Sequence, residues 1–177
     1  MSQVQVAHTA DLDTKTLQAA RDLCLGAFGD EFTEDDWRHG LGGMHALAYE
    51  DDELVGHASV VQRQLLVGGR ALRTGYVEAV AVRADRRRRG HGAAVMEPLE
   101  RIIRNAYELG ALGATDDGAA LYTRRGWLRW EGRLSALAPE GVTHTPEEEG
   151  FVYVLPVDGP LDLSGELTCD WRDGDVW

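Results

Sequence analysis

The sequence has few cysteines, almost no lysine and no long hydrophobic run. Two cysteines, Cys24 and Cys169, are too few for a disulfide framework, and neither they nor the six histidines show metal-ligand spacing. No apolar run approaches the roughly 18 residues of a membrane span. The N-terminus has neither the basic start nor the apolar stretch of a secretory signal. These absences predict a cytoplasmic protein with no metal and no membrane contact.

The charge balance is acidic and its basic side is almost entirely arginine. Lys and Arg number 18 against 30 Asp and Glu, a net charge of −12, which argues against a nucleic-acid partner. Lys15 is the only lysine, and five arginines lie between Arg83 and Arg89. The planar guanidinium suits phosphate. This pattern indicates a local anion site in a protein whose remaining surface favours cations, although an ordinary solubilising acidic surface is the alternative.

The length and composition fit one domain. With 177 residues, 44% of them hydrophobic, the chain can bury a sizeable core. Periodicity and turn signals predict a mixed α/β (α+β) fold with a largely antiparallel sheet. Two helices are expected to begin after residues 11–14 and after Thr33. Two more are expected over 92–109 and 118–125, and Pro98 should kink the first of these. Strands are expected over 4–8, 45–49, 54–67, 70–72, 76–82, 111–115, 127–134 and 151–155.

Two C-terminal segments stand apart from these elements. Residues 139–150 form a polar stretch long enough to be a functional loop. Residues 158–177 are acidic yet contain Trp171 and Trp177, and buried tryptophans favour a tail that docks on the domain over one that is solvated. We therefore expect a single domain, residues 1–177, with a docked acidic tail at about 158–177.

The strongest local signal is a strand, an arginine- and glycine-rich loop and a helix. Strand 76–82 is followed by Arg83-Ala84-Asp85-Arg86-Arg87-Arg88-Arg89-Gly90-His91-Gly92. Glycines let successive amides point at one anion, and a helix start adds unpaired N–H donors. The loop has neither the Walker ending nor the dinucleotide pattern. It predicts a pyrophosphate cradle, with a plain strand-to-helix turn as the alternative.

Two motifs carry a family resemblance. Arg87-x-x-Gly90-x-Gly92 after a valine-rich strand, and Leu121-Tyr122-x-x-Arg125-Gly126-Trp127 downstream, resemble the acyl-CoA motifs of the GNAT acyltransferase superfamily. Nearly the whole chain is similar to the aminoglycoside 2'-N-acetyltransferases. The segments that carry this narrower likeness are Gly42-Gly43-Met44-His45-Ala46, Gly75-Tyr76-Val77-Glu78, Arg125-Gly126-Trp127, and Cys169-Asp170-Trp171-Arg172-x-Gly174-Asp175-Val176-Trp177.

The resemblance implies a fold and a cosubstrate. It implies the GNAT fold, a central, mostly antiparallel sheet that is splayed open and flanked by helices. It also implies acetyl-CoA as cosubstrate and a homodimer. The amide of Val80 would polarise the thioester carbonyl, as in an oxyanion hole, and Val82 would pair with pantetheine. The pyrophosphate would lie on Arg87, Arg88, Arg89, Gly90, His91 and Gly92.

Two side chains would then handle protons. A carboxylate on an apolar strand is costly unless it is partnered or used, and alternation places Glu78 on the face of Tyr76, Val80 and Val82. By resemblance Glu78 is the base and acts through water, while Tyr122 is the general acid. The alternatives are a strand-end carboxylate paired with an arginine, and a tyrosine that packs in the core.

Acceptor recognition would depend on carboxylates, because aminoglycosides carry several ammonium groups. The resemblance implies that these are Glu31, Asp36, Glu78, Glu148 and Asp175, with the terminal carboxylate of Trp177. Glu31 and Glu148 stand where the family would have aspartate, which leaves fine specificity open, and each acid alone could be a solvated surface group. The run Glu147-Glu148-Glu149 does not say which member contacts the acceptor.

Three functions remain after this reading. The first is acetyl-CoA-dependent 2'-N-acetylation of aminoglycosides by direct attack in a ternary complex. The second is the same chemistry on another polyamine, a cell-wall amino sugar or a basic protein amine. The third is a non-catalytic acidic module that sequesters cations or acyl-CoA. A phosphate cradle together with a base and an acid argues against the third.

Overall fold

The computed structural model describes residues 3–177, and the chain divides into two compact units. Strands β3 (Glu53–Val67) and β4 (Arg70–Val82) each contribute residues to both units. The single domain expected from the sequence stays a prediction. The first unit comprises Met1–Val61 and Val77–Ile102, and the second comprises Gln62–Tyr76 and Ile103–Trp177.

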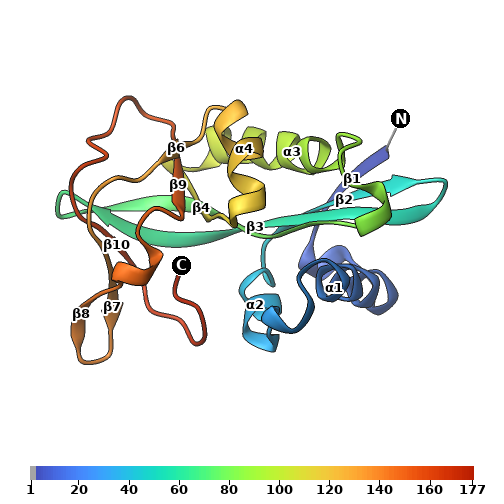
Figure 1. Ribbon diagram of the computed structural model, residues 1–177, viewed down its shortest axis with the longest axis horizontal. Coiled ribbons are helices and arrows are strands. Elements are labelled where there is room, and N and C mark those ends of the chain that lie inside the picture. Colours follow the sequence, from blue (N-terminus) through green and yellow to red (C-terminus); the bar gives the residue numbers. More distant parts are fainter. Residues whose placement is uncertain (1–2) are drawn as a thin grey trace. The chain divides into compact units, whose positions relative to one another are not determined.

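The first unit is an antiparallel sheet with helices on both faces (Figure 1). β1 (Gln3–His8) pairs with β2 (Met44–Glu50), which pairs with β3 around a tight acidic turn. Helices α1 (Thr14–Phe28) and α2 (Glu34–His39) lie on one face and α3 (His91–Ala106) on the other. Short 3₁₀ helices connect these elements at Thr9–Asp11, Gly29–Glu31 and Ala84–Arg86.

Helix starts in this unit follow the capping residues of the sequence. Asp13 accepts a 2.7 Å hydrogen bond from the amide of Thr16 and caps α1. Thr33 and Asp36 form a reciprocal capping box at α2, in which Asp36 accepts from the Thr33 amide at 2.7 Å. Both predicted helix starts are confirmed.

The core between α1, α2 and the sheet contains a histidine pair. Ala20, Cys24, Trp37, Leu47 and Ala81 form a buried cluster there, and burial raises the pKa of the Cys24 thiol to about 12. The predicted core position of Cys24 is confirmed, and its thiol is inert. His45 and His57 are fully buried beside the Trp37 ring, and their ring nitrogens lie 3.0 Å apart. Burial lowers the pKa of each histidine to about 4.

Acid is expected to destabilise the protein through this pair. The unfolded chain binds both protons below the ordinary pKa of 6.5, whereas the folded chain binds them only near pH 4. The free energy of unfolding therefore falls as pH falls from 6.5 towards 4, by up to about 1.4 kcal/mol per pH unit for each ring.

Urea unfolding at pH 7, 6 and 5 checks this expectation. Carboxylates whose folded pKa is lowered, such as Asp13 and Asp85, lose their contribution only below pH of about 4. The raised pKa of Glu148 acts in the opposite direction, so the histidine contribution is taken from the difference between wild type and His57→Leu. His57→Leu should make the free energy of unfolding depend less steeply on pH. Equal wild-type stability at pH 7 and pH 5 would contradict it.

The second unit contains a mixed sheet built from the C-terminal strands and its own parts of β3 and β4. β5 pairs in parallel with Thr74–Tyr76 of β4, and β9 pairs antiparallel with both β5 and β6. Next to the end of β3, β10 pairs antiparallel with β3 and parallel with β7, which forms a hairpin with β8 (Figure 1). These elements are β5 (Leu109–Gly113), α4 (Asp116–Arg124), β6 (Leu128–Arg129), β7 (Leu134–Ala138), β8 (Gly141–His144), a 3₁₀ helix (Pro146–Glu148), β9 (Val152–Pro156) and β10 (Leu167–Cys169).

The mixed, mostly antiparallel sheet agrees with the sequence prediction, including the tight β3–β4 turn. Gly68 and Gly69 have φ of 57° and 77°, the left-handed values that a two-residue hairpin turn requires. Gly75 has a different role, because a Cβ there would lie 2.8 Å from the Ile103 side chain. Glycine at 75 therefore allows the end of α3 to approach β4 closely.

Several predicted boundaries were wrong. The helix expected over 92–109 ends at Ala106, and Leu109 begins β5, so the strand expected over 111–115 lies over 109–113. Leu109 is buried, and an apolar residue at helical spacing fits a buried strand equally well. α3 is continuous through Pro98, so the helix does not break there, and the kink stays a prediction.

The region 127–150 also differs from the prediction. The single strand expected over 127–134 is replaced by the two-residue β6 and by β7, and the expected loop 139–150 contains β8 and a 3₁₀ helix. The amides of Glu131 and Gly132 both donate to the carbonyl of Leu163. This contact with a distant segment interrupts the strand.

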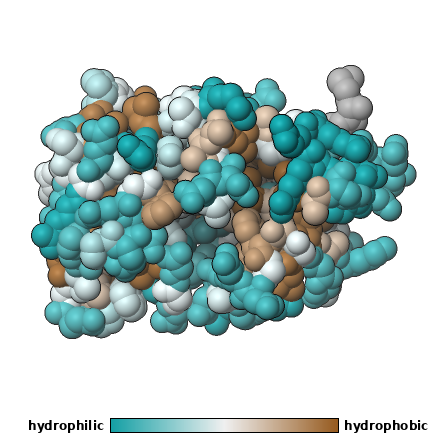
Figure 2. Space-filling view, in the orientation of Figure 1, coloured by the Kyte–Doolittle hydropathy of each residue, from teal (hydrophilic) through white to brown (hydrophobic). Residues whose placement is uncertain are grey.

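The tail and the surface complete the description. β10 joins the sheet and the Trp177 side chain is buried, whereas Trp171 is 47% exposed. Hydrophilic residues dominate the face shown in Figure 2, with smaller hydrophobic patches among them. None of the helices in the part of the chain that the structure describes is long and apolar enough to span a bilayer.

Candidate active site

Strand β4 contains a left-handed residue, Ala79, between two of the predicted site residues, Glu78 and Val80. Ala79 has φ of 50°, a left-handed conformation that costs a residue with a Cβ about 1–2 kcal/mol. A left-handed residue in a strand disrupts the pleat, as in a β-bulge. The alternation that placed Glu78 on the same face as Val80 therefore does not hold across Ala79. Glu78, Val80 and Val82 are all half-buried.

The loop after β4 divides its arginines between two roles. Arg83 binds Glu53 and Asp85 at 2.8 and 2.7 Å, and Arg86 binds Asp85 and Glu50 at 2.7 and 2.8 Å. These ion pairs tie the loop to itself and to the β2–β3 turn. Arg83 and Arg86 thus have a structural role that local composition did not reveal.

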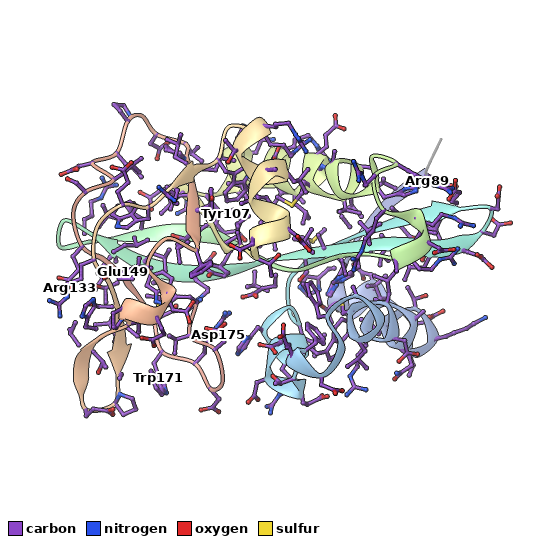
Figure 3. The ribbon with its side chains drawn as sticks, viewed as in Figure 1. Arg89, Tyr107, Arg133, Glu149, Trp171 and Asp175 are labelled. Atoms are coloured by element: carbon purple, nitrogen blue, oxygen red, sulfur yellow. The ribbon has the colours of Figure 1, made fainter. Side chains whose placement is uncertain are left out.

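The remaining arginines lie exposed where the loop meets α3. Arg87 donates to the carbonyl of Ala27 at 3.2 Å, and Figure 3 shows Arg89 in this loop. Arg88 and Gly90 have φ of 63° and 88°, and α3 begins at His91. Left-handed residues beside a helix N-terminus orient successive amides outward, which is the geometry of an anion nest. The loop can therefore hold a pyrophosphate.

The second unit contains an acidic cavity of about 450 Å³. Three of the predicted acceptor residues, Glu148, Asp175 and Trp177, line it. Two further acids do so as well: Asp116, which the sequence did not indicate, and Glu147, which it left open as a member of the glutamate run. The only sequence signal for this pair is its position, next to the start of α4 and next to Glu148. The other lining residues are Gly113, Ala114, Thr115 and Phe151.

The acidic lining gives this cavity an electrostatic preference for cations. Burial, followed by the negative charges of Asp175 and Glu147, raises the pKa of Glu148. Like charges held together in this way favour a bound cation. Glu149 behaves differently, because it binds His144 at 2.7 Å, which lowers its pKa. The structure thus answers which members of the glutamate run face the cavity: Glu147 and Glu148.

Buried arginine contacts fix the segment that carries Asp175 and Trp177. Arg63 in β3 is 4% exposed and donates to the Asp170 carboxylate at 2.7 Å and to the Val176 carbonyl at 2.8 Å. Arg172 donates to the Asp175 carbonyl at 2.8 Å. The Trp177 indole donates to Thr145 at 2.8 Å. Figure 3 shows Asp175 on this C-terminal loop.

Tyr122 lies in α4 against two other aromatic rings. The centroid of its ring lies 6.3 Å from that of the Trp127 ring and 6.4 Å from that of the Tyr153 ring. Burial raises the pKa of Tyr122, so the phenol stays protonated at neutral pH. Tyr122 thus packs in the core, as the alternative to a general acid predicted. The same burial keeps the phenol protonated, which a general acid also requires.

The three remaining predicted acceptor residues, Glu31, Asp36 and Glu78, lie in the first unit. Glu31 is exposed at the end of a 3₁₀ helix, and the Asp36 carboxylate is occupied by the capping box with Thr33. Asp36 therefore stabilises the start of α2, whether or not it also contacts the acceptor. Within residues 3–177, no three or more His, Cys, Asp or Glu side chains are grouped so that they could hold a metal ion.

Comparison with known proteins defines the class to which this fold and loop belong. Residues 9–129 match the acetyltransferase (GNAT) domain family, and the chain belongs to that family. Within it, a protein from Mycolicibacterium fortuitum described as an aminoglycoside 2'-N-acetyltransferase is 51% identical over 177 residues, which cover 98% of this chain and 91% of that protein.

Solved structures show the same fold at low sequence identity. The GNAT family N-acetyltransferase YhbS from Escherichia coli, solved in complex with CoA, matches with a TM-score of 0.63 and 16% identity over 95% of this chain and 89% of its own. A GNAT acetyltransferase from Brucella melitensis, in complex with acetyl-CoA, matches with a TM-score of 0.60 and 15% identity over 93% and 94%.

Proposed function

We propose that this enzyme transfers the acetyl group of acetyl-CoA to the 2'-amino group of aminoglycosides by direct attack in a ternary complex. The observation that carries the proposal is the 51% identity, over almost the whole length of both chains, to a protein of that description. The acidic cavity of the second unit supports it, because an acceptor with several ammonium groups needs several carboxylates.

The loop geometry supports the cosubstrate. The outward amides of Arg88–Gly92, at the start of α3, suit the pyrophosphate of acetyl-CoA, and the exposed Arg87, Arg88 and Arg89 add positive charge. The Val80 amide would polarise the thioester carbonyl, and Val82 would pair with the pantetheine arm.

The proposed chemistry assigns each proton to a side chain. The acceptor arrives as an ammonium ion, and Glu78 takes one of its protons through water, so that the neutral amine attacks the acetyl carbon. The carbon–sulfur bond then breaks, and Tyr122 donates its proton to the leaving thiolate. The attacking nitrogen loses its second proton as it becomes an amide, and this proton returns through water to the Tyr122 phenolate. Glu31, Asp36, Glu148, Asp175 and the Trp177 carboxylate would bind the remaining charges of the acceptor.

Tyr122→Phe is expected to lower kcat by about 10-fold. This loss is smaller than a typical general acid contributes, because a thiolate leaves without protonation more easily than an alkoxide. The KM values for both substrates should change little. Tyr107→Phe is the matched control, since Tyr107 is a half-buried tyrosine in the same unit (Figure 3). Equal rates for wild type and Tyr122→Phe across pH 6–9 would remove this role.

Release of free thiol from acetyl-CoA, measured with a panel of amines, tests the proposed function. Tobramycin carries a 2'-amine, whereas kanamycin A carries a hydroxyl at that position. Turnover with tobramycin and not with kanamycin A is expected. Turnover with neither, while acetyl-CoA still binds, would move the acceptor to another polyamine, a cell-wall amino sugar or a basic protein amine.

We further propose that the enzyme works as a homodimer in the cytoplasm without nucleic acid, membrane or metal. The family resemblance supports the dimer. Two free, buried cysteines support a reducing compartment. The net charge of −12 supports the absence of a nucleic-acid partner.

A further inference from the structure

A chain of hydrogen bonds runs through the core of the first unit and ends on Ala79. The Thr9 hydroxyl oxygen lies 2.8 Å from Nε2 of His45. Nδ1 of His45 lies 3.0 Å from Nε2 of His57. Nδ1 of His57 lies 2.9 Å from the carbonyl oxygen of Ala79. The chain thus links Thr9, which follows β1, to the one left-handed residue within β4.

For neutral rings, the last acceptor fixes the direction of the bond between the two histidines. A carbonyl oxygen only accepts, so Nδ1 of His57 carries the proton and its Nε2 is left as an acceptor. Nδ1 of His45 must then donate to His57, and Nε2 of His45 is left to accept. The Thr9 hydroxyl donates its single proton to this nitrogen, the nearer of two acceptors, at 2.8 Å against 3.2 Å for the Gly43 carbonyl. The amide of Gly42 donates to that hydroxyl oxygen at 2.9 Å and anchors the outer end. Burial, which lowers the pKa of each ring to about 4, keeps both imidazoles neutral at pH 7.5, so both are Nδ1–H tautomers with every ring nitrogen satisfied.

The surroundings hold the two rings in place. Both are fully buried, and the Trp37 ring packs against each of them, with its centroid 6.4 Å from His45 and 5.8 Å from His57. The Cys24 thiol, 3.6 Å from His57, points to the same Ala79 carbonyl. Polar groups in such a core are retained only where they are fully hydrogen-bonded. Here the His57 ring and the Cys24 thiol both point to the Ala79 carbonyl.

We propose that His57, oriented by His45 and Thr9, is a positioning residue that holds Ala79 in its left-handed conformation. Its bond to the Ala79 carbonyl stabilises a backbone shape that alanine does not favour by itself. Ala79 lies between Glu78 and Val80, so this shape sets the direction of the Glu78 side chain and of the Val80 amide. The inference deepens the proposed function and rests on it for the roles of those two residues.

The tautomers provide a test that needs no activity. In ¹⁵N-labelled protein at pH 7.5, long-range ¹H–¹⁵N correlation should show His45 and His57 as Nδ1–H tautomers. His8 is an internal reference of the opposite kind, because its Nδ1 accepts from the Ala10 amide at 3.1 Å and its Nε2 faces the Gly42 carbonyl at 2.9 Å. An Nε2–H tautomer at His57 would overturn the inference.

A double-mutant cycle tests positioning against simple core filling. His57→Leu keeps the bulk but removes the donor, so Ala79 should relax and kcat with tobramycin should fall about 10- to 100-fold, with KM for acetyl-CoA unchanged. Adding Ala79→Gly should restore most of kcat, because glycine adopts positive φ without strain. Ala81→Gly is the matched control, since Ala81 is buried in the same cluster and its φ is not positive.

Each outcome separates the two proposals. Rescue by Ala79→Gly but not by Ala81→Gly supports positioning. If Ala79→Gly lowers kcat further in the His57→Leu background, or if both glycines act alike, His57 only fills the core and the inference is wrong. Wild-type protein that shows the two Nδ1–H tautomers but acetylates no aminoglycoside would contradict the proposed function while the support of Ala79 by His57 stands.

Discussion

Replacing Glu78 by glutamine is expected to lower kcat for tobramycin acetylation by about 10²-fold or more at pH 7, the usual loss when a general base is removed. Glutamine keeps the size of the side chain and its hydrogen-bonding capacity but cannot take up a proton. The KM for acetyl-CoA should stay unchanged, because the pyrophosphate loop lies further along the chain, beyond Val82.

The pH profile distinguishes proton transfer from a change of shape. As pH rises, more of the acceptor amine is already neutral, so the deficit of Glu78→Gln should shrink between pH 7 and pH 9.5. Glu97→Gln, which changes an exposed acid of α3 in the same unit, is the control and should match wild type. A deficit that is constant with pH would indicate that Glu78 positions the backbone or the acceptor and is not the base.

Arg63→Met is expected to lower the free energy of unfolding by about 3 kcal/mol, near the lower end of the range for breaking a buried ion pair, because Asp170 is 40% exposed. The substitution leaves the Val176 carbonyl without its guanidinium donor. It also removes the cation that stacks on Tyr76, 4.6 Å from the ring centroid. Urea unfolding monitored by tryptophan fluorescence measures the change.

The same substitution should also affect acceptor binding selectively. The segment that Arg63 holds carries Asp175 and Trp177, so KM for tobramycin should rise while KM for acetyl-CoA stays nearly constant. Arg133→Met is the matched control, because Arg133 is 57% exposed and its pair with Glu166 contributes roughly 0–1 kcal/mol. If the two substitutions had equal effects on stability and on KM, the structural role of Arg63 would be refuted.

The sequence predicts those parts of the fold that depend on local physics. The cap at Asp13, the capping box of Thr33 and Asp36, and the paired glycines 68 and 69 each satisfy a backbone requirement within a few residues. The division between β6 and β7 has another origin. A Cβ at Gly132 would lie 1.9 Å from the carbonyl oxygen of Gly165, so a segment 33 positions away shapes this region. No local pattern contains that information.

The candidate site shows the same limit. Resemblance named Glu148, Asp175 and Trp177, and the structure places all three at one cavity. Asp116 was not predicted because nothing in its neighbourhood distinguishes it from a surface acid, and the run Glu147-Glu148-Glu149 did not show which of its members face a cavity. The left-handed Ala79 could not be foreseen either, since an alanine in a valine-rich strand predicts regular extended backbone. Its conformation depends on His57, 22 residues earlier in the sequence.

The bond between Arg63 and Asp170 spans 107 residues, which has a consequence for the order in which the protein matures. Contacts of such long sequence separation form late, because their loop-closure entropy is lost before they stabilise the chain. During synthesis from the N-terminus, every residue of the first unit has been made by Ile102, whereas the wall of the acidic cavity awaits residues 170–177. A nascent chain arrested before residue 170 would contain the whole pyrophosphate loop but no segment able to close that cavity.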